Sequence, residues 1–190
     1  MKKCIIIAHP WKGSFNHAIK DRLIKKINEK GYTVRVIDLY EDNFSPAISL
    51  NELKNYKEGQ ALDANVIRYQ NILKEVDDLI LIFPIWWYSM PAMIKGFVDK
   101  VMLKKFAYIE SKTGLVGQLI NIKKVTIITT SQAPTWYIKF IKGNFIDKIL
   151  RRGIFKDLGI KKSSWINFPN IKTSTKINRA NFLERLDVSN

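Results

Sequence analysis

The stretch KCIIIAHPWKGSFN (residues 3–16) contains the junction that decides the fold. Its apolar run, residues 4–8, has the length and composition of a strand covered on both faces, as strands of parallel sheets are. An amphipathic run starts at Phe15, and Ser14 directly before it is a preferred residue type at a helix N-cap. A strand that passes into a helix through a tight connection is the opening unit of an alternating α/β chain.

The same alternation continues along the rest of the chain. Strand-like runs follow at residues 32–38, 78–83, 124–129 and 163–168. Helical patterns occur at 64–75, after Pro91, at 136–152 and at 175–186, whereas 39–59 and 106–122 are irregular. Five strands alternating with helices predict a parallel sheet with helices on both faces, and they favour the flavodoxin-like order 2-1-3-4-5. We therefore expect a single flavodoxin-like α/β domain over residues 1–190.

The composition is that of a folded protein. Of the 190 residues, 46% are hydrophobic and 26% are charged, which excludes a disordered chain. The one cysteine, Cys4, lies inside the first apolar run, and we expect a buried, unreactive thiol in a reducing compartment. No signal-peptide pattern follows Met1 and no apolar run approaches the length of a membrane span. We expect a cytoplasmic protein without membrane insertion.

The formal charge of +15 admits two interpretations. One is a polyanionic partner, either nucleic acid or a membrane surface. The other is a generally lysine-rich surface, which is favoured because the lysines are scattered over most of the chain and Ile and Asn are abundant as well. We expect no specific nucleic-acid partner, although the charge would help to attract anionic dinucleotides.

Three loops are expected to meet at one crevice. In the order 2-1-3-4-5, ligands bind outside the carboxyl ends of the strands, beside strands 1 and 3. The loop after strand 1 matches neither GxGxxG nor GxxxxGK[ST], yet it leads into a helix N-terminus, which favours anions. Ser14, Asn16 and His9 add side-chain donors there. The alternative is ordinary helix capping by Ser14.

The other two loops are suited to a flat polar ring. FPIWWYSMP (83–91) follows strand 3, and its three consecutive aromatic residues are costly to leave in water. They either stack on a ligand or fill the core or a dimer contact. TTSQAPTWY (129–137) follows strand 4 and offers hydroxyls and an amide to the edge of a heterocycle. A phosphate site beside a flat polar ring describes a flavin nucleotide.

The sequence of these loops resembles that of a known family, the flavodoxin-like NAD(P)H:quinone oxidoreductases, which include the diaphorases. The resemblance runs from about residue 3 to residue 137. Its matching pieces are His9 with Ser14-Phe15-Asn16; Asp38-Leu39-Tyr40 with Phe44 and Pro46; residues 83–92 with Lys95-Gly96-Phe97 and Asp99; and Thr129-Thr130.

The resemblance implies a set of flavin contacts. On the phosphate side they are His9, Ser14, Phe15 and Asn16; along the isoalloxazine ring Pro84, Ile85, Trp86, Trp87 and Tyr88; and at its polar edge Thr129, Thr130, Ser131 and Gln132. Tyr137 falls where the diaphorases have an active-site tyrosine, and it is the catalytic candidate. The sequence departs from the diaphorases in two places. Ser131-Gln132 replaces a Gly-Gly pair, and no histidine follows Tyr137 within residues 138–143.

The implied function is hydride transfer from NAD(P)H through a bound flavin to a quinone or a similar planar electrophile. The short chain after strand 5 favours FMN, with FAD as the alternative. The resemblance also implies a homodimer, and no metal site is predicted. Two alternatives stay open, a flavin-binding regulatory subunit and a one-electron carrier, although such carriers are typically acidic. The residues do not distinguish NADH from NADPH.

Overall fold

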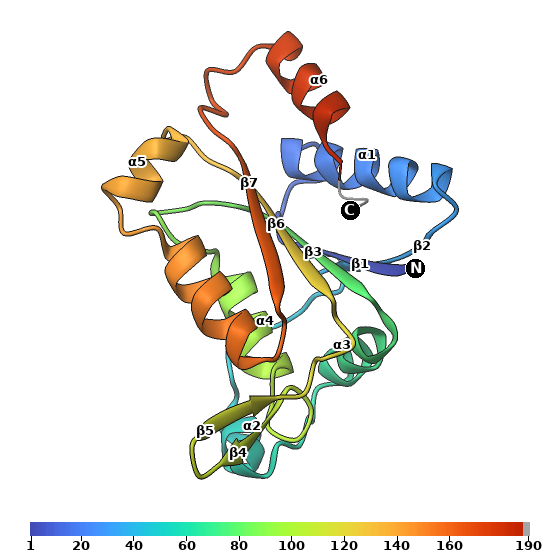
Figure 1. The fold of residues 1–190 in the computed structure, drawn as a ribbon, viewed down its shortest axis with the longest axis vertical. Coiled ribbons are helices and arrows are strands. Elements are labelled where there is room, and N and C mark those ends of the chain that lie inside the picture. Colours follow the sequence, from blue (N-terminus) through green and yellow to red (C-terminus); the bar gives the residue numbers. More distant parts are fainter. Residues whose placement is uncertain (188–190) are drawn as a thin grey trace.

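A five-stranded parallel sheet carries the fold of residues 1–187, the part of the chain that the computed structural model describes (Figure 1). Its strands lie in the order β2-β1-β3-β6-β7, and every neighbouring pair is parallel. Their bounds are β1 Lys2–Ile7, β2 Thr33–Asp38, β3 Asp78–Pro84, β6 Lys124–Thr130 and β7 Lys162–Phe168. The flavodoxin-like α/β architecture predicted from the sequence is therefore confirmed.

Two apolar layers cover the sheet, one on each face. Helices α1 (Phe15–Glu29) and α6 (Lys176–Arg185) pack on the face that carries Ile5 and Ile7. Helices α3 (Ala64–Glu75) and α4 (Ala92–Val101) pack on the opposite face, with Cys4 and Ile6. Successive side chains of a strand alternate between faces, so the uninterrupted apolar run of β1 supplies both layers.

The predicted strand order 2-1-3-4-5 is corrected to 2-1-3-6-7. The segment between β3 and β6, interpreted as irregular, forms two further strands, β4 (Tyr108–Ser111) and β5 (Gly114–Gly117). They pair antiparallel with each other as a separate two-stranded sheet. The main sheet gains no strand from them, but the predicted fourth and fifth strands become β6 and β7.

Two other segments differ from the prediction. The stretch after β2 contains a short helix, α2 (Leu50–Asn55), and a 3-10 turn, η1 (Tyr56–Glu58). The single helix predicted over 136–152 is two, α5 (Thr135–Phe140) and a π-helical segment, η2 (Ile146–Phe155). The break follows from left-handed backbone at Gly143 (φ 77°) and Asn144 (φ 50°), which no helix can continue through.

The first strand–helix junction forms as predicted. Ser14 caps α1, and its side chain accepts a hydrogen bond from the backbone N–H of His17. Cys4 is fully buried, as predicted, and burial raises the pKa of its thiol to about 12, which disfavours the reactive thiolate. No helix within residues 1–187 is long and apolar enough to cross a membrane.

A buried lysine ties the long segment after β2 to α4. Lys100 donates to Ser45 O at 2.9 Å and lies 3.0 Å from carboxylate oxygens of both Glu52 and Asp63. Nearby, a Cβ on Gly96 would come within 2.3 Å of Pro46 O, so α4 approaches this segment too closely for any side chain. These contacts fix the long segment after β2 against α4, the helix that follows the aromatic loop.

Candidate functional site

A cavity of about 630 Å³ lies at the carboxyl ends of β1, β3 and β6. It is the place where the strand order reverses, which is where open α/β sheets bind ligands. Its lining comes mainly from the three predicted loops: His9, Trp11, Gly13, Ser14, Phe15, Asn16, Pro84, Ile85, Trp86, Trp87, Tyr88, Thr130, Ser131, Gln132, Ala133, Ile138, Ile171 and Arg179. The structure thus brings together every predicted cofactor-binding residue except Thr129.

The N-terminus of α1 forms the polar end of this cavity. Asn16 is buried, and its Oδ1 accepts a 2.8 Å hydrogen bond from Thr130 Oγ1. The amide nitrogen of Asn16 is buried without a hydrogen-bond partner. An unpaired buried donor is costly unless a ligand satisfies it. Together with the free N–H groups of the first helical turn, this donor makes the N-terminus of α1 suited to an anion, and we call this part of the cavity the anion end.

His9 extends the donor set on the strand side. Its Nδ1 accepts a 3.1 Å hydrogen bond from the backbone N–H of Trp11, so Nε2 is the donor of the neutral ring. Partial burial, and to a smaller extent His17, lower the pKa of His9 below its ordinary value. The His9 ring lies 6.2 Å from the ring of Trp86, which places it between the anion end and the aromatic loop.

The aromatic loop is held in a strained turn. Trp86 and Ser89 exchange backbone hydrogen bonds of 3.1 and 2.9 Å, while φ is +49° at Trp87 and +61° at Tyr88. Left-handed backbone is unusual for bulky residues, and such strain gathers at ligand sites. The turn leaves Trp87 94% exposed, whereas Trp86 and Tyr88 are only partly exposed at the cavity wall.

Thr129 does not line the cavity. Its fully buried Oγ1 donates to Asn167 Oδ1 at 2.7 Å and accepts from Trp165 Nε1 at 2.9 Å. Thr129 and Thr130 are adjacent in β6, so their side chains point to opposite faces, and only Thr130 reaches Asn16. Thr129 is therefore the predicted cofactor-binding residue whose side chain the structure does not bring to the cavity.

Tyr137 lies next to the cavity rather than in its wall. Its ring centroid is 6.0 Å from that of Tyr88, which does line the cavity. Lys142 Nζ sits 4.7 Å from the centre of the Tyr88 ring and 5.6 Å from that of Tyr137. A cation thus lies over both tyrosines in the segment where the diaphorase-like histidine is absent. The sequence pattern gave no reason to select Lys142.

Arg179 of α6 was also missed by sequence reasoning. It reaches the cavity from beyond the last strand, where its guanidinium donates to Ser174 Oγ at 2.8 Å and to Ile171 O at 3.0 Å. Its guanidinium carbon lies 5.9 Å from the centre of the Phe15 ring, so α6 adds a positive charge near the anion end. Only the packing of α6 on α1 brings it there, and no local motif signals that packing.

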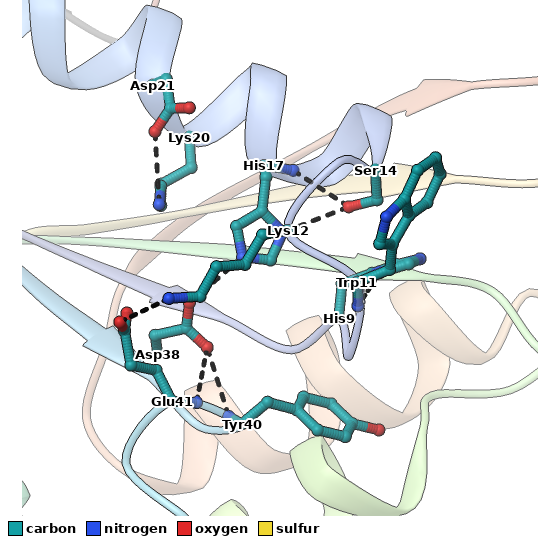
Figure 2. Close-up of polar contacts among 10 residues, drawn as sticks. All are labelled: His9, Trp11, Lys12, Ser14, His17, Lys20, Asp21, Asp38, Tyr40 and Glu41. Carbon is teal, nitrogen blue, oxygen red and sulfur yellow. Dashed lines mark hydrogen bonds and ion pairs between the residues drawn. The ribbon is translucent and has the colours of Figure 1, made fainter.

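A buried polar chain runs behind the anion end (Figure 2). His17 Nδ1 lies 3.2 Å from Ser14 Oγ, and His17 Nε2 lies 3.2 Å from Asp38 Oδ2. The other carboxylate oxygen of Asp38 accepts backbone N–H bonds of 3.2 Å from Tyr40 and Glu41. His17 lies in α1, and no motif in the sequence singled it out.

Comparison with known proteins agrees with this geometry. The family model described as the flavodoxin-like fold, Flavodoxin_2, matches residues 1–187. The chain belongs to this flavodoxin-like family. The resemblance to NAD(P)H:quinone oxidoreductases stated from the sequence is confirmed, because relatives named for that activity align with the chain.

Three relatives within the flavodoxin-like family illustrate the similarity. An "Uncharacterized NAD(P)H oxidoreductase" of Haemophilus influenzae is 32% identical over 90% of this chain and 85% of its own length. The rat "NAD(P)H dehydrogenase [quinone] 1" is 31% identical over 70% of this chain, and the match spans only 54% of the rat protein. The solved "NAD(P)H:quinone oxidoreductase from Methanothermobacter marburgensis" is 25% identical, with a TM-score of 0.85 over 97% of this chain and 94% of that one.

Proposed function

We propose that this protein is an NAD(P)H-dependent flavin oxidoreductase that reduces a quinone or a similar planar electrophile. The family and the names of the relatives support the reaction class. The observation that carries the proposal is the cavity itself. It places the unpartnered amide nitrogen of Asn16 and a helix N-terminus at one end, and an aromatic turn at the wall.

The residues fit a flavin mononucleotide. The phosphate would take the hydroxyl of Ser14, the amide of Asn16 and the free N–H groups of the first turn of α1. The cavity of about 630 Å³ is in the usual range for small-molecule and cofactor sites. The single phosphate of FMN matches this anion site, and we propose FMN rather than FAD as the cofactor.

The chain's own residues would orient both the cofactor and its substrates. A bound flavin would accept a hydride from NAD(P)H and deliver it to the acceptor. Pro84 and Ile85 would lie along the ring, Trp86 and Tyr88 would cover it, and Ser131 and Gln132 would border its polar edge. Lys142, together with Tyr137, would stabilise negative charge that develops near Tyr88 during the reaction.

A homodimer is part of this proposal. Trp87, Trp136, Phe140 and Ile141 are 94%, 59%, 79% and 60% exposed, and they belong to the aromatic loop and to the segment around α5. Contiguous exposed apolar residues mark interaction surfaces. A second copy seated there would cover these side chains and complete the rim of the cavity.

The anion end can be tested with one charge-changing pair. Asn16→Asp replaces the unpaired donor with an acceptor of nearly the same shape and should weaken FMN binding by about 100-fold, since a carboxylate would face the phosphate. Asn28→Asp makes the same change of charge at an exposed position near the other end of α1 and should leave FMN binding unchanged. Equal affinities of the two variants in a fluorescence titration would contradict the proposed phosphate site.

A further inference from the structure

We propose that binding of an anionic group at the N-terminus of α1 takes up a proton at His17 Nδ1, so that His17 couples cofactor binding to pH. This inference rests on the proposed function, because the anion in question is the phosphate of the flavin nucleotide. It assigns a role to the buried chain Ser14–His17–Asp38, which lies behind the cavity lining rather than within it.

The Asp38 end of the chain fixes one ring proton of His17. Asp38 Oδ1 accepts the backbone N–H groups of Tyr40 and Glu41, and its Oδ2 faces His17 Nε2 at 3.2 Å. An ionised carboxylate has no proton to donate, so it can only accept a hydrogen bond from the ring. His17 Nε2 therefore carries a proton whatever the charge of the ring, and Nδ1 is the atom whose proton can come and go.

The state of Nδ1 decides what Ser14 can offer to the cavity. With a neutral ring, the Ser14 hydroxyl donates to His17 Nδ1 across 3.2 Å and accepts from the backbone N–H of His17, so it presents only its remaining lone pair to a ligand. With a charged ring, Nδ1–H donates to Ser14 Oγ, and the hydroxyl proton is released to point into the cavity. Since Ser14 lines the cavity, only the charged form of His17 lets this residue donate to an anion.

The charge of Asp38, on the β2 side, contacts the ring and favours its charged form. Two other charged side chains on this side of the ring are held in ion pairs of their own. Glu41 pairs with Lys12 at 2.7 Å, and Lys20 of α1 pairs with Asp21 at 3.2 Å.

On the cavity side, the neutral His9 ring lies 6.3 Å from that of His17, and Arg179 of α6 adds a positive charge to the cavity lining. This charge disfavours a second cation nearby, and a bound anion would offset it. The gain in free energy therefore comes when the anion and the proton are present together.

The thermodynamic consequence is a linked equilibrium. If binding takes up about one proton, the affinity for the anion falls by about tenfold for each unit of rising pH within the range of uptake. The proton comes from solvent, and no other atom moves between groups. The linkage is reciprocal, so a saturating anion must also raise the fraction of His17 rings that are charged.

Isothermal titration calorimetry can count this proton. FMN and riboflavin, which lacks the phosphate, would be titrated into the wild-type protein in two non-phosphate buffers of different ionisation enthalpy, from about pH 6 to about pH 9. At the pH of greatest uptake, FMN should bind with about one proton more than riboflavin does. Equal proton counts for both ligands throughout this range would overturn the inference and leave flavin binding intact. Failure of both ligands to bind would instead overturn the proposed function.

Variants and spectroscopy locate the proton. The chain contains only two histidines, so the ¹⁵N signals of their rings can be assigned by one substitution. FMN, but not riboflavin, should convert His17 Nδ1 to the protonated form. The FMN-specific uptake should vanish in His17→Gln and in Ser14→Ala, and it should persist in His9→Gln. If the FMN-specific uptake vanishes in His9→Gln but persists in His17→Gln, the proton is taken up at His9, and the inference is overturned. Should His17→Gln fail to fold, Ser14→Ala and the wild-type spectra still decide.

Discussion

Thr130 Oγ1 donates a 2.8 Å hydrogen bond to Asn16 Oδ1 and thereby joins the end of β6 to the first turn of α1. The two residues are far apart in the sequence, and both are buried at the polar end of the cavity. Because the amide oxygen of Asn16 is engaged in this bond, its nitrogen is left as a fixed, unpaired donor. The orientation of the Asn16 amide in the proposed phosphate site therefore depends on a residue at the end of β6.

Thr130→Val should weaken FMN binding by about tenfold, because Asn16 loses the partner that orients its amide. Thr129→Val is the matched control. It removes a hydroxyl that bonds Asn167 and Trp165 and should lower the free energy of unfolding by about 1–2 kcal/mol. FMN affinity of the folded Thr129→Val protein should stay within about twofold of wild type. Weaker FMN binding by Thr129→Val than by Thr130→Val would contradict the placement of the two side chains.

Trp87→Gly should raise the free energy of unfolding of the flavin-free protein by about 1 kcal/mol, since glycine adopts a φ of +49° without strain. Trp136→Gly removes another exposed tryptophan, from helix α5, and should lower the free energy of unfolding by about 1 kcal/mol, because glycine is unfavourable within a helix. Urea denaturation measures both changes. A loss of stability in both variants would mean that the turn is not strained.

Tyr137→Phe and Lys142→Met should each lower the turnover number by about tenfold without changing flavin content, because in the proposed mechanism both groups stabilise charge near Tyr88. Lys139→Met is the control: its ammonium lies over Trp165, outside the cavity wall. Steady-state kinetics with NADPH and a soluble quinone give the comparison. Unchanged turnover in Tyr137→Phe would remove this residue from the mechanism.

The buried thiol of Cys4 should make the free energy of unfolding fall at high pH. Burial raises the pKa of its thiol from 9.0 to about 12, so between these values the folded chain holds a proton that the unfolded chain has released. The contribution is fully present below pH 9.0 and falls by up to about 1.4 kcal/mol per pH unit as the pH rises toward 12. Unfolding free energies of the wild type and Cys4→Ala should therefore converge above pH 9.0. Parallel curves for the two proteins would show that the thiol is accessible to water.

The sequence around the first strand–helix junction was enough to predict which residues lie at the N-terminus of α1. The positions of the other residues at the cavity depend on tertiary contacts. Ser14 and Asn16 could be identified because the strand–helix junction that positions them is contiguous in the sequence. The side chains of Thr129 and Thr130 could not be assigned to the correct sides, because alternation along a strand does not say which face meets α1.

Other features needed the three-dimensional structure from the start. Lys142 reaches the tyrosines only because the chain turns back at Gly143 and Asn144. Arg179 reaches the cavity only because α6 packs against α1. The hairpin of β4 and β5 is short and mostly exposed, so its sequence lacked the apolar pattern that identified the main strands.

The most direct test of the central claim is the absorbance spectrum of the purified protein, recorded after incubation with FMN and removal of unbound flavin. Anaerobic NADPH is then added, followed by a soluble quinone. The account predicts a protein that retains about one FMN per chain, is bleached by NADPH and regains its colour with the quinone. A protein that retains neither FMN nor FAD, or whose bound flavin NADPH does not reduce, would contradict it.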